Sequence, residues 1–156
     1  MYQALAVLAL LAACGFLVWI RLRYTVVTVD GRSMLPALSP GDRVVVRRTR
    51  LARIRQSDIV VVRQSRTPLR RIPVGVRPRQ PRLDRTGPWF IKRVAAVPGD
   101  PVPRESVHAL RDAADPSVPS GRLVLLGDNP ESSYDSREHG YFPADRLLGK
   151  VVRRLS

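Results

Sequence analysis

The sequence has few of the residues that cross-link small proteins or hold metals in them. Its 156 residues include one cysteine, Cys14, and two histidines, His108 and His139. An intramolecular disulfide needs two cysteines, and structural zinc sites draw their four ligands mainly from Cys and His. The composition therefore excludes a disulfide-stapled miniprotein and argues against a zinc cage. We expect no metal and no cofactor.

Lysine and aromatic residues are also scarce, although the chain is strongly basic. There are 27 Lys and Arg residues against 13 Asp and Glu, a formal charge of +14, and Lys92 and Lys150 are the two lysines. Arginine stays protonated in proteins, whereas a buried lysine can lose its proton and act as a base. A surface that stacks on nucleic-acid bases needs aromatic side chains among its basic ones, and few aromatic residues lie among these arginines. No nucleic-acid partner is therefore expected.

The distribution of turn residues points to a single β-rich domain. The 14 Pro and 10 Gly residues disfavour a helical bundle, and the length suits one domain of modest size. Short β-type runs, rich in β-branched residues and bounded by turn residues, occur at 24–29, 43–47, 58–63, 89–97, 123–126 and 147–152. This pattern predicts an antiparallel β body over residues 24–156.

An apolar segment precedes this body. Residues 4–20 carry no charge, and the run ends at Arg21 and Arg23. At about 1.5 Å per residue a helix of this length just crosses a hydrocarbon core. A cleaved signal would have a basic residue ahead of the run, and a lipoprotein signal would not stay apolar beyond Cys14. We favour a retained membrane anchor at 1–23, with the two cleaved signals as alternatives.

Two polar segments interrupt the strand pattern. Residues 64–88 contain seven Arg, five Pro and one acid, which predicts an extended surface loop or a loose hairpin. Residues 101–120 form a second connection, with a helical turn or two expected around 105–113.

Three clusters contain candidate chemistry. Ser33 lies between the turn residues Gly31 and Pro36, Lys92 lies inside an apolar strand, and Ser133 belongs to a polar loop. Taken singly, each has an ordinary structural explanation: a turn serine bonding its own backbone, a strand cation reaching solvent, and a loop of turn formers. Their chemistry becomes specific only in combination.

In combination, and following an apolar segment, the clusters resemble the type I signal peptidase family of membrane-bound serine proteases with a Ser/Lys dyad. The matching motifs are Ser-Met-x-Pro at 33–36, Lys-Arg-Val at 92–94, Pro-Gly-Asp at 98–100, Gly-Asp-Asn at 127–129 and Ser-x-Asp-Ser-Arg at 133–137. The resemblance implies a mainly β fold, with an antiparallel signal-peptidase-like catalytic sheet after one N-terminal transmembrane helix.

The resemblance also implies a role for each matching residue. Ser33 would be the nucleophile, Lys92 the general base that takes its proton, and Ser133 the hydroxyl that holds the lysine. The backbone N–H of Ser33 would contribute to the oxyanion hole. The supporting residues would be Asp128, Asp135 and Arg137, which brace the active-site loop, and Met34, buried beside the nucleophile.

The chemistry requires an unusual lysine. A serine hydroxyl needs an adjacent base, and a lysine has a reference pKa of about 10.4. Lowering it to ~8 takes roughly 3 kcal/mol, for which burial against apolar neighbours is the expected source. Arg93, next in the strand, should face the opposite side.

The function implied is a signal peptidase I-like endopeptidase. It would remove signal peptides from exported preproteins after small residues at −1 and −3, as a single-pass monomer with its catalytic body on the extracytoplasmic side of the cell membrane. Its partners would be those signal peptides and the lipid bilayer. The alternatives are a maturation peptidase dedicated to one exported protein, and a non-enzymatic basic module tethered to the membrane.

Overall fold

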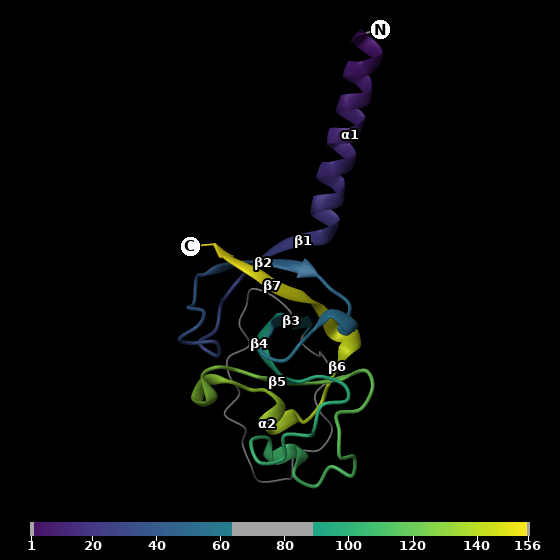
Figure 1. Cartoon of the computed structure of the whole chain (residues 1–156). Coiled ribbons are helices and arrows are strands. Elements are labelled where there is room, and N and C mark those ends of the chain that lie inside the picture. The colour runs from purple at the N-terminus through teal and green to yellow at the C-terminus, as the bar shows by residue number, and fades with distance from the viewer. Residues whose placement is uncertain (1, 64–88, 156) are drawn as a thin grey trace.

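The structure is a computed structural model that describes residues 2–63 and 89–155, and it begins with one long helix. Helix α1 (Tyr2–Arg23) extends away from the body (Figure 1). Its window Ala6–Arg23 has a mean hydropathy of 1.9, and none of that window is buried. The helix is therefore long and apolar enough to cross a membrane. The predicted loop at 64–88 lies outside the described residues.

The rest of the described chain is built on one antiparallel sheet. Its strands are β1 (Tyr24–Thr28), β2 (Arg43–Arg48), β3 (Ile59–Arg63), β4 (Trp89–Ala96), β5 (Arg122–Leu126), β6 (Phe142–Pro143) and β7 (Leu147–Leu155). The spatial order is β1-β2-β7-β3-β4-β5-β6, and every pairing is antiparallel. The predicted fold, an antiparallel β body after one apolar helix, is confirmed.

Two strands differ from the sequence prediction by more than one residue. Strand β6 was not predicted, because two residues are too few to show alternation. Strand β7 runs three residues past the predicted end at 152, where Arg153 and Arg154 pair with Val45 and Val44 of β2. Exposed arginines give no apolar pattern from which a strand could be predicted. The length of β7 is therefore set by its pairing with β2.

The core lies on both faces of β3. Val60, Val61 and Val62 are all buried, which explains why this strand is continuously apolar in sequence. Val61 packs in a cluster with Met34, whereas Val60 and Val62 pack with Leu125 from β5. Strand β4, hydrogen-bonded to β3, is thereby held between two apolar clusters.

The segment 101–120 and helix α2 (Ser136–His139) lie at the end of the body opposite α1 (Figure 1). Within 101–120 the predicted helical turn is a single 3-10 turn, His108–Leu110. Four residues of this segment, Val102, Val107, Leu110 and Val118, are buried in a third apolar cluster. This polar-looking connection therefore packs against the sheet.

Candidate active site

Lys92 is a buried lysine in the middle of the sheet. It occupies the fourth position of β4, opposite Val60 of β3, and its residue is only 3% exposed. Its Nζ lies 5.7 Å from the centre of the Phe90 ring, on the face to which strand alternation assigns both residues. The strand thus removes the amine from bulk water.

This burial changes the proton affinity of the amine. Desolvation lowers the pKa of Lys92 from its ordinary value of 10.5 to about 8. The negative charge of Asp135 opposes this effect, and the positive charge of Arg137 reinforces it. With a pKa of about 8, roughly a tenth of the lysine is neutral at pH 7, so a free amine is available at moderate pH.

A chain of hydrogen bonds orients the amine. Lys92 Nζ lies 2.9 Å from Ser133 Oγ, and Ser133 Oγ lies 2.5 Å from Asp135 Oδ2. An ionised carboxylate can only accept hydrogen bonds, so the Ser133 hydroxyl must donate its single hydrogen bond to Asp135. Ser133 must then accept a hydrogen bond from Lys92, which fixes the direction of one N–H of the amine. The other N–H and the lone pair of the neutral amine stay available for another partner.

Asp135 is fully buried, and its negative charge is stabilised by hydrogen bonds and by an ion pair with Arg137. Its exposure is 0%, and its carboxylate also accepts from Gly127 N at 2.7 Å, Arg137 N at 3.0 Å and Arg137 Nη1 at 2.9 Å. Arg137 Nη2 donates in turn to Gly127 O at 3.2 Å. A buried charge is tolerated when it is paired and hydrogen-bonded in this way. The pair therefore joins the loop at 133–137 to the end of β5.

Asp135 also starts helix α2. As its N-cap it accepts from the backbone of Arg137, and Glu138 Oε2 accepts from Asp135 N at 2.9 Å, completing a capping box. The Asp-x-x-Glu pattern at 135–138 is the sequence signal from which this box can be predicted. Ser136 was also missed: it is 0% exposed, and its Oγ accepts from Leu125 N at 2.8 Å.

Gly127 is the point where the Ser33 loop meets the Ser133 loop. A β-carbon at this position would lie 2.7 Å from the carbonyl oxygen of Ser33 and 2.6 Å from Cβ of Ser133. That carbonyl oxygen also accepts from Asn129 N at 2.9 Å. These close approaches bring the backbone of residue 33 close to Ser133, although the two residues are a hundred positions apart in the sequence.

The Ser33 loop is anchored to the hydrophobic core through Met34. Met34 is 1% exposed and belongs to the cluster of Val61, while Ser33 itself stays partly exposed. Met34 O accepts from Leu38 N at 2.9 Å. The serine is thus presented by a turn whose next residue is fixed in the interior.

Asp128 lies beside this network without joining it. Its carboxylate binds Arg93 through two bonds, to Nε at 2.8 Å and to Nη2 at 2.6 Å. Arg93 also donates to Ser57 O at 3.0 Å, and its bond to Asp128 raises its pKa. Arg93, for which the sequence indicated no role, thus ties β4 beside Lys92 to the loop after β5.

The histidines lie apart from these bonds. His139 packs edge-on against Tyr134 and Phe142, with ring centres 4.1 Å and 5.6 Å away, and burial lowers its pKa. His108 is exposed. Within residues 2–63 and 89–155, no three His, Cys, Asp or Glu side chains gather closely enough to hold a metal ion.

Comparison with known proteins places the chain in a family. The family model for signal peptidase, peptidase S26, matches residues 2–107 and 103–155. A signal peptidase I of Leptolyngbya laminosa is 27% identical over 145 residues, which cover 81% of this chain and 66% of that protein. A signal peptidase I of Bacillus caldolyticus is 26% identical over 155 residues, covering 79% and 74%.

A further relative is a mitochondrial ATP-independent inner membrane protease subunit 1a of Arabidopsis thaliana. It is 30% identical over 139 residues, covering 85% of this chain and 72% of the relative. The chain spans about two thirds to three quarters of the length of these three relatives. With a family match that runs through almost the whole chain, this protein belongs to the signal peptidase family, peptidase S26.

Proposed function

We propose that the protein is a membrane-anchored signal peptidase in which Ser33 is the nucleophile and Lys92 the general base. The observation that carries the proposal is the buried amine of Lys92, whose pKa is about 8 and whose direction is set by Ser133. Gly127 supports the pairing, because it touches both the Ser33 and the Ser133 segments. Family membership supports a serine-type peptidase.

In the proposed reaction, the Ser33 hydroxyl attacks the carbonyl carbon of the scissile bond while its proton passes to neutral Lys92. The oxyanion that forms accepts from the backbone N–H of Ser33. Protonated Lys92 then gives its proton to the departing amine, which leaves an acyl-enzyme on Ser33. Lys92 next takes a proton from water, whose oxygen attacks the ester carbonyl. The protonated lysine then returns this proton to the Ser33 oxygen as the ester bond breaks, which releases the carboxylic acid and regenerates the serine hydroxyl and the neutral amine.

The substrate would bind along β4. Strand β5 pairs with β4 only from Arg93 onward, at Leu126, so among the described residues Trp89 to Lys92 have no strand partner on that side. An extended peptide can add as a strand there and reach Lys92. Side chains alternate along such a peptide, so positions −1 and −3 share one face, and small residues there allow a close approach to the sheet.

Helix α1 is proposed as a single-pass anchor, with the body on the extracytoplasmic side, where signal peptides of exported preproteins emerge. The length and apolarity of α1 support the anchor. The candidate site is built from residues of one chain, which is compatible with action as a monomer.

The test is cleavage of a preprotein with Ala at −1 and −3 in detergent. Ser33→Ala, Lys92→Ala and Lys92→Arg should each lower kcat/KM on the order of 1000-fold or more. Lys92→Arg is the most informative of the three, because arginine keeps the charge but cannot serve as a base. Lys150→Arg is the matched control. Lys150 lies on β7, two strands from Lys92, and its amine pairs with Asp58 at 2.5 Å, so this variant should cut like wild type.

Full activity in any of the three site variants would refute the Ser33/Lys92 mechanism. A panel of preproteins then separates the two enzyme readings. Cleavage of many precursors with small residues at −1 and −3 indicates general processing, whereas cleavage of a single one indicates a dedicated maturation peptidase.

A further inference from the structure

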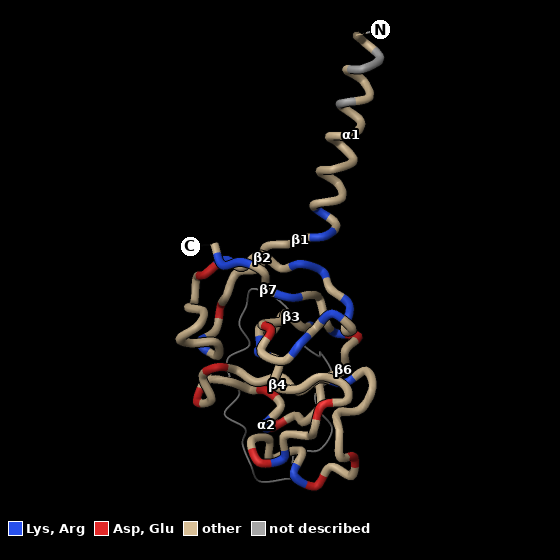
Figure 2. Tube along the Cα trace, viewed as in Figure 1, with Lys and Arg blue, Asp and Glu red and all other residues tan. Residues whose placement is uncertain are grey.

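A basic groove lies at the base of helix α1, outside the candidate active site. Its volume is about 880 Å³, and it is formed by the last turn of α1, the end of β2 with the segment after it, and the start of β7. Seven of its sixteen lining residues are arginines, against one acid, Asp145. Figure 2 shows Lys and Arg clustered around β2 and the segment that follows it, below α1.

Among the residues that the structure describes, no ion pair neutralises the positive charge of the groove arginines. The ion pairs between described residues are Arg93–Asp128, Arg137–Asp135, Lys150–Asp58 and Arg154–Asp42, and none of them uses a groove arginine. Arg47, Arg48 and Arg50 are all exposed. Like charges gathered on concave surface attract anions and raise their local concentration.

The groove also has the aromatic and apolar parts expected at a membrane surface. Trp19 and Trp89 both line it, and each has an arginine over its ring: Arg23 at 5.7 Å and Arg63 at 5.6 Å from the ring centres. Tryptophan is enriched at the level of lipid headgroups, where one end of the side chain is apolar and the other wet. Leu22 adds an apolar wall from α1 itself.

The position of α1 decides what the occupant can be. If the helix crosses the bilayer, as proposed above, its last turn ends where the hydrocarbon ends and the headgroups begin. Because that turn supplies Trp19, Leu22 and Arg23 to the groove, the groove opens at headgroup level. Arginine guanidinium groups match phosphate oxygens with two parallel hydrogen bonds.

We propose that this groove binds the phosphate headgroup of an anionic phospholipid. The arginines contact the phosphate, while Trp19 and Leu22 lie against the apolar part of the lipid. The bound lipid joins the helix base to β2 and β7, and so holds the body in one orientation on the bilayer. This inference goes beyond the peptidase function and depends only on the placement of α1 in the membrane.

Native mass spectrometry of the full chain in detergent tests the proposal. The probes are phosphatidylglycerol and phosphatidylcholine with identical acyl chains. Wild type should retain phosphatidylglycerol at least about tenfold better than phosphatidylcholine. The variant Arg47→Gln/Arg48→Gln/Arg50→Gln should lose phosphatidylglycerol affinity by about fivefold per arginine, on the order of 100-fold in all.

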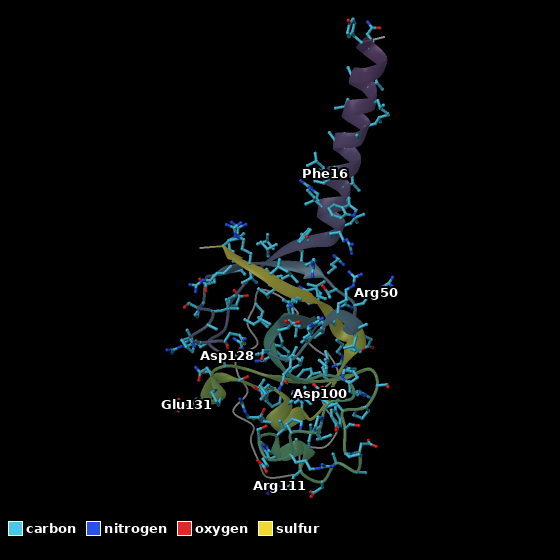
Figure 3. All side chains as sticks on the ribbon, viewed as in Figure 1. Phe16, Arg50, Asp100, Arg111, Asp128 and Glu131 are labelled. Carbon is cyan, nitrogen blue, oxygen red and sulfur yellow. The ribbon has the colours of Figure 1, made fainter. Side chains whose placement is uncertain are left out.

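The matched control removes three exposed arginines outside the groove: Arg55→Gln/Arg111→Gln/Arg122→Gln. Figure 3 labels Arg50 on the α1 side of the body and Arg111 at the opposite end. The control should bind phosphatidylglycerol like wild type. Equal losses of phosphatidylglycerol affinity in both triple variants would show that only net charge matters, and would overturn the proposal. Unchanged binding in the groove variant would overturn it as well.

Two further arms complete the test. Millimolar inorganic phosphate should not displace the lipid, and displacement would reassign the groove to free anions. Ser33→Ala should lose cleavage and keep lipid binding, so failure of the lipid proposal and failure of the peptidase proposal are read separately. A single Arg50→Glu substitution, in the segment after β2, should weaken lipid retention without touching a strand.

Discussion

At the residue scale, the candidate site is a series of side chains that each constrain the next. Asp135 accepts the hydrogen bond that the Ser133 hydroxyl donates, and Ser133 therefore accepts from Lys92. This bond fixes the direction of one N–H of the Lys92 amine. The carboxylate acts through Ser133 and is a positioning residue. Such a chain depends on every member being present with its hydrogen-bonding direction intact.

Removal of the Ser133 hydroxyl tests this ordering. Ser133→Ala deletes the acceptor for Lys92, and a hydrogen bond involving a charged group is worth about 1.5–3 kcal/mol. We expect kcat/KM at pH 8 to fall about 10- to 100-fold with little change in KM, measured by steady-state cleavage. Ser132→Ala, at an exposed neighbouring serine, is the control. A change confined to KM would assign Ser133 to substrate binding instead.

Burial of Lys92 also predicts a cost in stability that depends on pH. Its folded pKa of about 8 lies below the ordinary 10.5, so between these values the unfolded chain binds more protons and stability rises with pH. The cost is fully present below pH 8 and vanishes above 10.5. Lys92→Met should therefore raise the free energy of unfolding at pH 7 by about 1–3 kcal/mol while abolishing cleavage.

Denaturant titration in detergent at several pH values measures this effect. The gain from Lys92→Met should shrink steadily as the pH rises from 8 toward 10.5. A gain that is independent of pH would mean that the amine is not desolvated in the folded state.

At the scale of elements, the site depends on how closely three segments approach one another. The turn after β1 carries Ser33, β4 carries Lys92, and the loop after β5 carries Ser133. Gly127 is where the first and third meet, and no side chain fits between them. The ion pair of Arg93 with Asp128 joins the second segment to the third.

This packing predicts a strong effect from one methyl group. Gly127→Ala must push the Ser33 carbonyl and Ser133 apart, and a displacement of about 1 Å at reacting groups can cost on the order of 100-fold in rate. We expect kcat/KM to fall by that factor in the cleavage assay. Gly15→Ala is the control, because nothing lies within 4 Å of a β-carbon there. Wild-type activity in Gly127→Ala would show that the contact is not needed for alignment.

At the scale of the whole molecule, the body has one end at the base of α1 and another end distal to it. Helix α1, β2 and the groove lie at the first, and α2 with the 101–120 segment lies at the second (Figure 1). The candidate site is built around β4, an interior strand that lies between β3 and β5. A lipid in the groove and a peptide along β4 would occupy different surfaces, so the lipid and cleavage measurements address separate parts of the protein.

Much of this could be predicted from the sequence, because the signals involved are local. An uncharged run specifies α1, alternation and turn residues specify the longer strands, and the motifs around Ser33, Lys92 and Ser133 specify the family. The two-residue β6 and the end of β7 could not be predicted, since both are defined by the strands they pair with. The roles inferred for Asp128, Asp135 and Arg137 remain predictions for mutagenesis.

By itself the sequence determined the residue types, their order and the elements that carry them. Only the tertiary structure decided that Lys92 is 3% exposed, because its burial comes from strands and loops distant in the chain. It likewise decided that Ser133 accepts from the amine, and that arginines at 23, 47 and 146 share one groove. Proton affinity and charge density depend on distances through space, and sequence spacing does not encode those distances.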